Sequence, residues 1–434
     1  MEAVGRLEDR IVDLYQRILG LIEKRDNEKN FRVPEPNRPL FESLIEQLKE
    51  TMVYYVLGVD DINEARRWIN ELFSIIEFVK NKLGAKGIVL SKELASFVED
   101  PLRHLKKKLF IYTHDLVRGR LDLASYIRTS MAALRTSYRT NMRSIYQSWV
   151  FLALLSLVGL RIIYPEHGFP SIDRSGKQRS GTIPPNIVVE TRRGGLLSFF
   201  LEAPRPIGWE DEGDLARSWR LYTALRPDIL VYGGFVDNIV DLRGNPPIRR
   251  PDVIVECKEL EDWYLRYRDI RGPFAKPLTA EEWRAKWIEG LWTGLADALG
   301  VEREQLAAAI KERRTMRLRE YKIVVLYKRL YNPRRMYLVS RMKIPGDVRS
   351  FLESEGITVV DGVGFSAEKL REVALELEEY AHRDLDAELS LLPAEVAKLI
   401  LEIIEIFRRK GVSKSVSEVL IEALKAYRES IGRR

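Results

Sequence analysis

The spacing of apolar residues changes near residue 160, and this change constrains the fold of the 434-residue chain more than any other feature. Before it, apolar residues recur every three to four positions, as in VGRLEDRIVDLYQRILGLIEK and ARRWINELFSIIEFVKNKL, which is typical of amphipathic helices. After it come short runs rich in Val, Ile and Phe, such as NIVVETRR and LLSFFLEA, which are typical of strands. The pattern predicts an all-α N-terminal domain followed by an α/β core with a mixed sheet.

We expect three domains: a helical module at 1–112, an α/β domain at 113–383 and a helical tail at 384–434. Ser91 is placed to cap a helix in the first domain. In the second, Gly194-Gly195 is placed to turn a hairpin, and TAEEWRAKWIEGLWTGLADALG predicts a helix at 279–300. Strands are predicted at 160–165, 186–193, 196–203, 226–232, 252–258, 321–330, 334–342 and 356–363, with 334–342 paired to 321–330.

The amino-acid composition excludes several classes of protein and favours a charge-rich one without disulfides. Charged residues make up 31% of the chain, a surplus that suits the surface ion pairs of a thermophilic, archaeal-like protein. The single cysteine, Cys257, excludes an intramolecular disulfide framework and a Cys-based zinc site. The longest apolar run, WVFLALLSLVGL, is too short to span a bilayer, and the N-terminus lacks an apolar signal core. We therefore expect a cytoplasmic protein with no membrane partner, whose net charge of +7 is compatible with a polyanion.

An acid and a base end the apolar segment DVIVECK. Because strand side chains alternate, Glu256 and Lys258 project on the same side, and a buried pair of charges needs a partner or a task. Asp228 begins another apolar segment, RPDILVY; if the two strands are neighbours, Asp228 and Glu256 can converge on one cation. Two carboxylates with water and phosphate suit Mg²⁺. We expect Asp228 and Glu256 as metal ligands, and Lys258 as the catalytic group that orients water or neutralises charge on a phosphate.

Pro227-Asp228 followed by Glu256-Cys257-Lys258 at the end of a Val/Ile strand resembles the PD-(D/E)xK nuclease superfamily, which has the restriction-endonuclease-like fold. The resemblance covers about 113–345. It implies a mixed β-sheet core flanked by helices, in which a helix precedes a hairpin, adjacent strands carry the Asp and the (D/E)xK, and a helix and a strand follow. It also implies a Mg²⁺- or Mn²⁺-dependent endonuclease, a hydrolase of phosphodiester bonds, and favours DNA over RNA.

The first core helix of that superfamily often places a glutamate in the site, and in TNMRSIYQSWVFLALLSLVG the matching position holds Gln147. A neutral amide is a weaker metal ligand than a carboxylate. The alternative function is therefore a nucleic-acid-binding or assembly protein with a decayed nuclease site. Glu190 and Glu202, on the predicted hairpin, are additional site candidates if the hairpin folds over the site.

Simpler interpretations stand beside these assignments. Glu256 and Lys258 could form a surface pair on an edge strand, and Asp228 could simply begin its strand, because Pro-Asp is common turn chemistry. Asp252 rivals Asp228, but it lies on the same strand as Glu256 rather than across a ladder from it. Cys257 faces the other way and is typical of a small core residue.

Four arginines follow one face of the helix that precedes Trp149, with Tyr126 and Tyr138 beside them. They are Arg128, Arg135, Arg139 and Arg143. Such a stripe could bind nucleic-acid phosphates or form a solvated face with ordinary ion pairs.

The tail resembles a ribbon-helix-helix domain over about 45 residues. A strand ends in Leu-Pro, a helix follows at 394–410, and GVSKSVSEVLIEAL opens a second helix after Gly411. Ala387, Leu389 and Leu391 stand where that family places polar base-reading groups, so the resemblance implies a homodimer through two tails rather than base readout. The alternative is a plain helical hairpin that packs on its own chain.

Overall fold

The computed structural model of the chain describes residues 2–25, 31–175, 183–203, 226–240, 249–270, 316–382, 394–409 and 419–426. It divides into two compact units. One unit comprises Met1–Phe78 and Val89–Leu152, and the other comprises Val79–Ile88 and Ala153–Arg434. Within the ranges described, the helices lack the combination of length and apolar composition that a membrane span requires.

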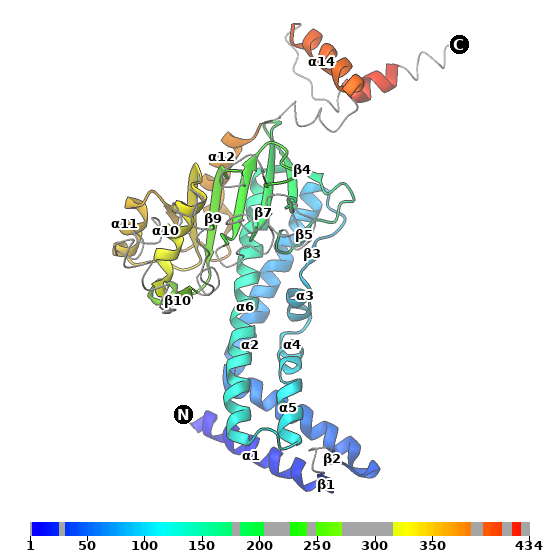
Figure 1. Cartoon of the computed structure of the whole chain (residues 1–434), viewed down its shortest axis with the longest axis vertical. Coiled ribbons are helices and arrows are strands. Elements are labelled where there is room, and N and C mark those ends of the chain that lie inside the picture. The colour runs from blue at the N-terminus through cyan, green and yellow to red at the C-terminus, as the bar shows by residue number, and fades with distance from the viewer. Residues whose placement is uncertain are drawn as a thin grey trace, which may run out of the picture. The chain divides into compact units, whose positions relative to one another are not determined.

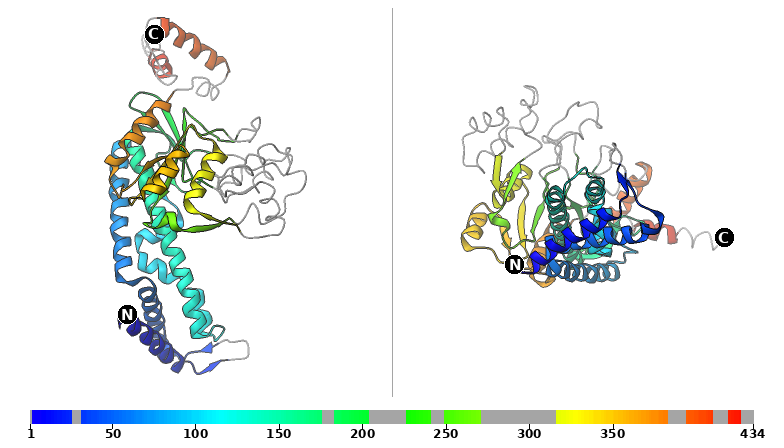
Figure 2. Two further views of the ribbon diagram at one scale, coloured as in Figure 1. Left: turned by 90° about the vertical axis from the view of Figure 1, so that its left-hand side faces the viewer. Right: turned by 90° about the horizontal axis from the view of Figure 1, so that it is seen from below.

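The first unit is helical, as its periodicity predicts. Its helices are α1 (Glu2–Gly20), α2 (Arg38–Leu83), α3 (Lys92–Glu99), α4 (Pro101–Lys108), α5 (Phe110–Val117) and α6 (Leu123–Val158), and the last residues of α2 and α6 belong to the second unit. Helices α2 and α6 run side by side (Figure 1 and Figure 2), and the Tyr138 hydroxyl on α6 donates to the Asp61 carbonyl on α2 at 2.8 Å. Short strands β1 (Lys24–Arg25) and β2 (Phe31–Arg32) pair in antiparallel fashion after α1.

Local sequence signals set the ends and the bend of these helices. The Ser91 hydroxyl accepts from the Leu94 N–H at 3.3 Å, which confirms the predicted cap of α3. Asp100 caps α4 in the same way, accepting from the Arg103 N–H at 3.0 Å. Helix α2 is interrupted at Gly58, whose φ of +79° is accessible to glycine at little cost.

A seven-stranded mixed sheet forms the core of the second unit, in the order β13-β12-β9-β8-β7-β6-β4 (Figure 1). From β4 to β9 neighbouring strands are antiparallel, whereas β9, β12 and β13 are parallel. The strands are β4 (Gly159–Tyr164), β6 (Ile187–Thr191), β7 (Leu196–Leu201), β8 (Ile229–Gly233), β9 (Val253–Lys258), β12 (Arg335–Ser340) and β13 (Thr358–Val360). The predicted α/β class with a mixed sheet is confirmed.

Helices cover both faces of the central strands. Leu230, Ile254 and Leu338 share one face and pack with apolar residues of α10 (Glu320–Tyr331) and α11 (Gly346–Ser354). On the opposite face, the Tyr337 hydroxyl donates to Glu376 of α12 (Arg371–Tyr380). Every residue of β6, β7, β8 and β9 is buried, which explains why these strands read as continuous apolar runs.

The strand predicted at 321–330 is wrong, because these residues lie within helix α10. A short apolar run is equally compatible with a buried strand and a buried helix. The sheet topology requires the helix: β9 and β12 are parallel, and parallel neighbours need a crossover connection. The predicted pairing of 334–342 with 321–330 is wrong for the same reason, since β12 lies between β9 and β13. The helix predicted at 279–300 lies outside the described residues.

The tail contains helix α14 (Ala394–Arg409) and a helical segment at 419–426. Ile400, Ile404 and Val419 are buried between them, with Phe407 packed alongside. The residues expected to form the tail strand lie outside the described ranges, and pairing of two tails stays a prediction.

Candidate active site at the ends of strands β8 and β9

Asp228 and Glu256 face each other across the β8–β9 ladder. Ile229 pairs with Val255, and one further step along this antiparallel register sets Asp228 opposite Glu256. The Asp228 N–H donates to Glu256 Oε2 at 3.2 Å, and the Cys257 N–H donates to Asp228 Oδ2 at 2.7 Å. Each carboxylate is therefore held by a backbone N–H of the opposite strand.

Lys258 lies on the same face of β9 as Glu256. Its Nζ is 2.9 Å from Glu256 Oε1, and the side chains of Lys258 and Glu256 are 7% and 4% exposed. Strand β9 is flanked by β8 and β12, so the interpretation as a surface pair on an edge strand is wrong. The ammonium also lies 5.6 Å from the centroid of the buried Trp263 ring, within the range of a cation–π contact.

Glu320 joins this group although the sequence analysis did not single it out. It is the first residue of α10 and is buried, and its Oε1 lies 3.1 Å from Lys258 Nζ. The Glu320 N–H donates to the Arg266 carbonyl at 2.9 Å, which fixes the start of the helix. The signal that could have found it is an acid that opens the crossover helix after β9, and it was missed because the segment was interpreted as a strand.

The contacts of Asp252 and Cys257 indicate structural roles for both residues. Asp252 accepts from the Gly233 N–H at 2.8 Å and pairs with Arg334 at 3.1 Å, so it fixes the start of β9. The Cys257 side chain projects on the face opposite Glu256, and burial, followed by the charge of Asp228, raises the pKa of its thiol well above the ordinary value. A thiol that stays protonated is a poor nucleophile.

The other predicted acids lie elsewhere in the sheet unit. Glu190 is buried on β6 and pairs with Arg161 on β4, two strands away from β8. Glu202 follows β7 at a φ of +39°; its backbone N–H donates to the Asp228 carbonyl at 2.9 Å, while its carboxylate pairs with Arg174. Glu202 thus adjoins the site through its backbone.

Gln147 and the four arginines of the stripe lie on α6, in the part of that helix that belongs to the first unit. Gln147 is buried on α6. Arg128, Arg135 and Arg139 are exposed and Arg143 is half-buried, so a phosphate-binding role for the stripe stays a prediction. The neighbouring tyrosines are packing residues: Tyr126 is fully buried, and burial raises its pKa to about 12.

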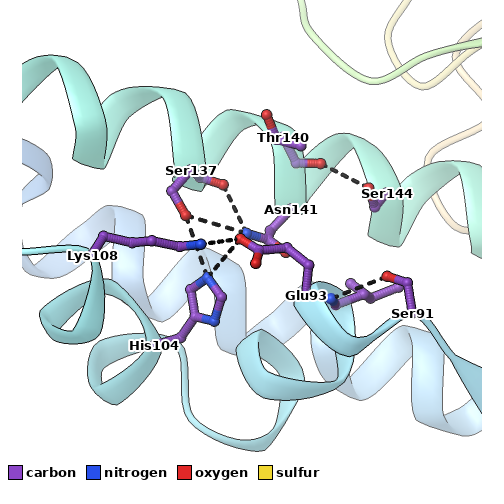
Figure 3. Close-up of polar contacts among 9 residues, drawn as sticks. Ser91, Glu93, His104, Lys108, Ser137, Thr140, Asn141 and Ser144 are labelled. Carbon is purple, nitrogen blue, oxygen red and sulfur yellow. Dashed lines mark hydrogen bonds and ion pairs between the residues drawn. The ribbon is translucent and has the colours of Figure 1, made fainter.

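The first unit holds a second polar cluster around a buried histidine, which we call the His104 cluster: Glu93, His104, Lys108, Ser137 and Asn141 (Figure 3). His104 Nε2 lies 3.1 Å from Glu93 Oε1 and 3.4 Å from Ser137 Oγ. A Ser–His–acid relay requires the serine and the acid at opposite ring nitrogens. Both contacts here involve the same nitrogen, so this arrangement is not a nucleophilic triad.

Within the ranges that the structure covers, no three His, Cys, Asp or Glu side chains form a group that could hold a metal ion. Asp228 and Glu256 contribute two buried carboxylates from opposite positions of the β8–β9 ladder. Comparisons of the chain with protein-family models, with curated proteins and with solved structures find no match.

Proposed function

We propose that the chain is a metal-dependent nuclease that hydrolyses phosphodiester bonds in DNA, with Asp228 and Glu256 as ligands of Mg²⁺ or Mn²⁺ and Lys258 as a catalytic residue. One observation carries the proposal: two buried carboxylates face each other across adjacent strands, and a buried lysine ammonium lies 2.9 Å from one of them.

The order of elements supports the same proposal. Helix α6 precedes the antiparallel strands β7, β8 and β9, helix α10 follows, and β12 then pairs in parallel with β9. The PD-(D/E)xK superfamily, which the sequence resembles, has a helix, a hairpin, adjacent strands that carry the Asp and the (D/E)xK, and then a helix and a strand. Asp228 directly precedes β8 and Glu256 to Lys258 end β9, which is consistent with that arrangement.

The donor set fits the proposed metal. Mg²⁺ binds hard oxygen ligands and is usually held by one or two carboxylates while it keeps several waters, so a pair of carboxylates suffices. When bound, the ion would supply Lewis-acid polarisation of the phosphodiester and a bound water of lowered pKa.

The side chains of the chain itself supply orientation and charge. Backbone N–H groups hold the Asp228 and Glu256 carboxylates before any ligand arrives, and such preorganisation avoids the cost of ordering them during the reaction. The Lys258 ammonium has donor protons to orient an attacking water or to neutralise charge that develops on the phosphate.

A second candidate function is nucleic-acid binding or assembly without cleavage. It is favoured by Gln147, a neutral amide where the resemblance places the acid of the first core helix. A site that lacked this acid and had lost its activity would retain the fold and the arginine stripe.

Cleavage assays test the proposal. The full chain is incubated with plasmid DNA, single-stranded DNA and RNA in the presence of Mg²⁺ or Mn²⁺, beside Asp228→Asn and Lys258→Met. We expect a loss of cleavage of about 100-fold or more in both variants, because each removes a group placed in the reaction.

Asp252→Asn is the matched control. Residue 252 directly precedes β9, its asparagine keeps an acceptor for the Gly233 N–H, and the variant should cleave like the unaltered chain. Equal cleavage by all variants would contradict the proposed site. Binding of DNA without cleavage under either metal would favour the second candidate function, and cleavage of RNA alone would correct the substrate.

A further inference from the structure

The Lys258 ammonium is shared between two buried carboxylates from different elements. Nζ lies 2.9 Å from Glu256 Oε1 on β9 and 3.1 Å from Glu320 Oε1 on α10. The ring of Trp263, in a short 3-10 helix (Trp263–Leu265) after β9, lies 5.6 Å from the same atom. Three separate segments therefore fix where the ammonium lies.

The backbone of Glu320 is held by contacts that do not involve Lys258. Its N–H is bonded to the Arg266 carbonyl, and the hairpin of β10 (Tyr267–Ile270) and β11 (Met316–Arg319) ends directly before it. A carboxylate in the first turn of a helix is also favoured by the helix dipole. The fold thus places Glu320 at the start of α10, from where its carboxylate reaches the Lys258 ammonium.

A cation bound by Glu256 would compete with Lys258 for the same carboxylate. Glu256 Oε1 accepts from the ammonium, so the bond between them weakens the attraction of Glu256 for any other positive charge. Glu320 offers the ammonium a second carboxylate at a similar distance. If Glu320 were neutral, the ammonium would bind Glu256 more tightly, and a cation would have to displace it.

We propose that Glu320 is a positioning residue that competes with Glu256 for the Lys258 ammonium and thereby keeps Glu256 available to a divalent cation. This inference rests on the proposed function, since it concerns the same metal site. It assigns to α10 a role in setting cation affinity, in addition to its role as the crossover between β9 and β12.

Mn²⁺ titration calorimetry on the full chain tests the inference through binding rather than activity. Glu320→Gln should lower Mn²⁺ affinity about tenfold, within the range of couplings measured between residues in contact. In a Lys258→Met background, where no ammonium competes, the same substitution should change affinity less than about twofold.

Two further variants define the effect. Glu355→Gln removes another glutamate that pairs with α10, through Arg329 at 2.9 Å, and should leave Mn²⁺ affinity unchanged. Glu320→Asp keeps the charge but withdraws the carboxylate from Lys258, so it should lose about as much affinity as Glu320→Gln. It also serves as the second test if Glu320→Gln fails to fold.

Each outcome decides the matter. Equal losses from Glu320→Gln in both backgrounds would make Glu320 a direct ligand and overturn the inference, as would wild-type affinity in Glu320→Asp. If Asp228→Asn abolishes Mn²⁺ binding and Glu320→Gln leaves it unchanged, the positioning role alone is overturned. A wild-type chain that binds no Mn²⁺, or binds it no better than Asp228→Asn does, would overturn the proposed metal site and this inference together.

Discussion

The His104 cluster and the group around Lys258 both bring charged side chains together, but they bury these side chains to different extents. In the His104 cluster the side chain of Glu93 is 51% exposed and that of Lys108 is 34% exposed, while the imidazole is buried. In the sheet, the side chains of Glu256, Lys258 and Glu320 are 4%, 7% and 11% exposed. The His104 cluster keeps its ions in contact with water, and the group around Lys258 does not.

The difference in burial favours the group around Lys258, rather than the His104 cluster, as the candidate for catalysis. Moving an ion from water into a protein costs several kcal/mol, and replacing a buried ion pair by apolar residues is often neutral or stabilising. Stability alone therefore gives little reason to hold several ions at the end of β9. The His104 cluster avoids that cost and is adequately explained by packing between α3, α4 and α6.

The largest expected effect is that of Lys258→Met on stability. It leaves the carboxylates of Glu256 and Glu320 buried without that ammonium, which should lower the free energy of unfolding by about 3–5 kcal/mol. Denaturant unfolding of the metal-free chain measures it. Lys108→Met, which removes a lysine that pairs with Glu93 at 2.5 Å near water, should cost less than about 1 kcal/mol. Similar costs at the two lysines would contradict the comparison.

A smaller effect is expected in the pH dependence of the His104 cluster. Burial lowers the pKa of His104, against an opposing effect of Glu93, so its folded pKa lies below the unfolded value of about 6.5. As pH falls through about 6.5, the unfolded chain takes up a proton that the folded chain does not, so stability falls. The slope from one such group is at most about 1.4 kcal/mol per pH unit.

Urea unfolding between pH 7.5 and 5.5 (roughly one unit on either side of that unfolded pKa) measures this slope. In His104→Gln the contribution should disappear, and in Glu93→Gln it should increase, because the acid that favours the protonated ring is gone. An unchanged slope in His104→Gln would exclude this residue as its source.

The smallest expected effect is that of Ser137→Ala. Its hydroxyl contacts with His104 and Asn141, at 3.4 and 3.5 Å, are long for hydrogen bonds, and the 2.8 Å bond from Asn141 goes to the Ser137 carbonyl, which alanine retains. We expect a cost below about 1 kcal/mol by thermal unfolding. A loss as large as that in Lys258→Met would mean that the His104 cluster depends on the serine as a relay would.

Much of the sheet could be predicted from the sequence because its strands are buried on both faces. Runs such as Ile187–Thr191 and Val253–Lys258 are short, rich in β-branched residues and bounded by turn residues. Pairing two such runs as neighbouring strands predicted that Asp228 and Glu256 would be adjacent. Apolar composition does not distinguish a buried strand from a buried helix, so α10 was missed, and Glu320 with it. The helix that carries Tyr126 was likewise predicted, but the burial of this tyrosine was not, because which residues pack inward depends on tertiary contacts.

Because β9 and β12 are parallel, a long crossover that includes α10 joins them, and this connection affects how the chain assembles its site. Lys258 and Glu320 are 62 positions apart, and Asp228 and Glu256 are 28 positions apart, so no local segment contains the group. Contacts between distant segments form slowly, since each must overcome the entropy of closing a long loop. We therefore expect the arrangement of these charges to form late in folding, once β8, β9 and α10 have come together.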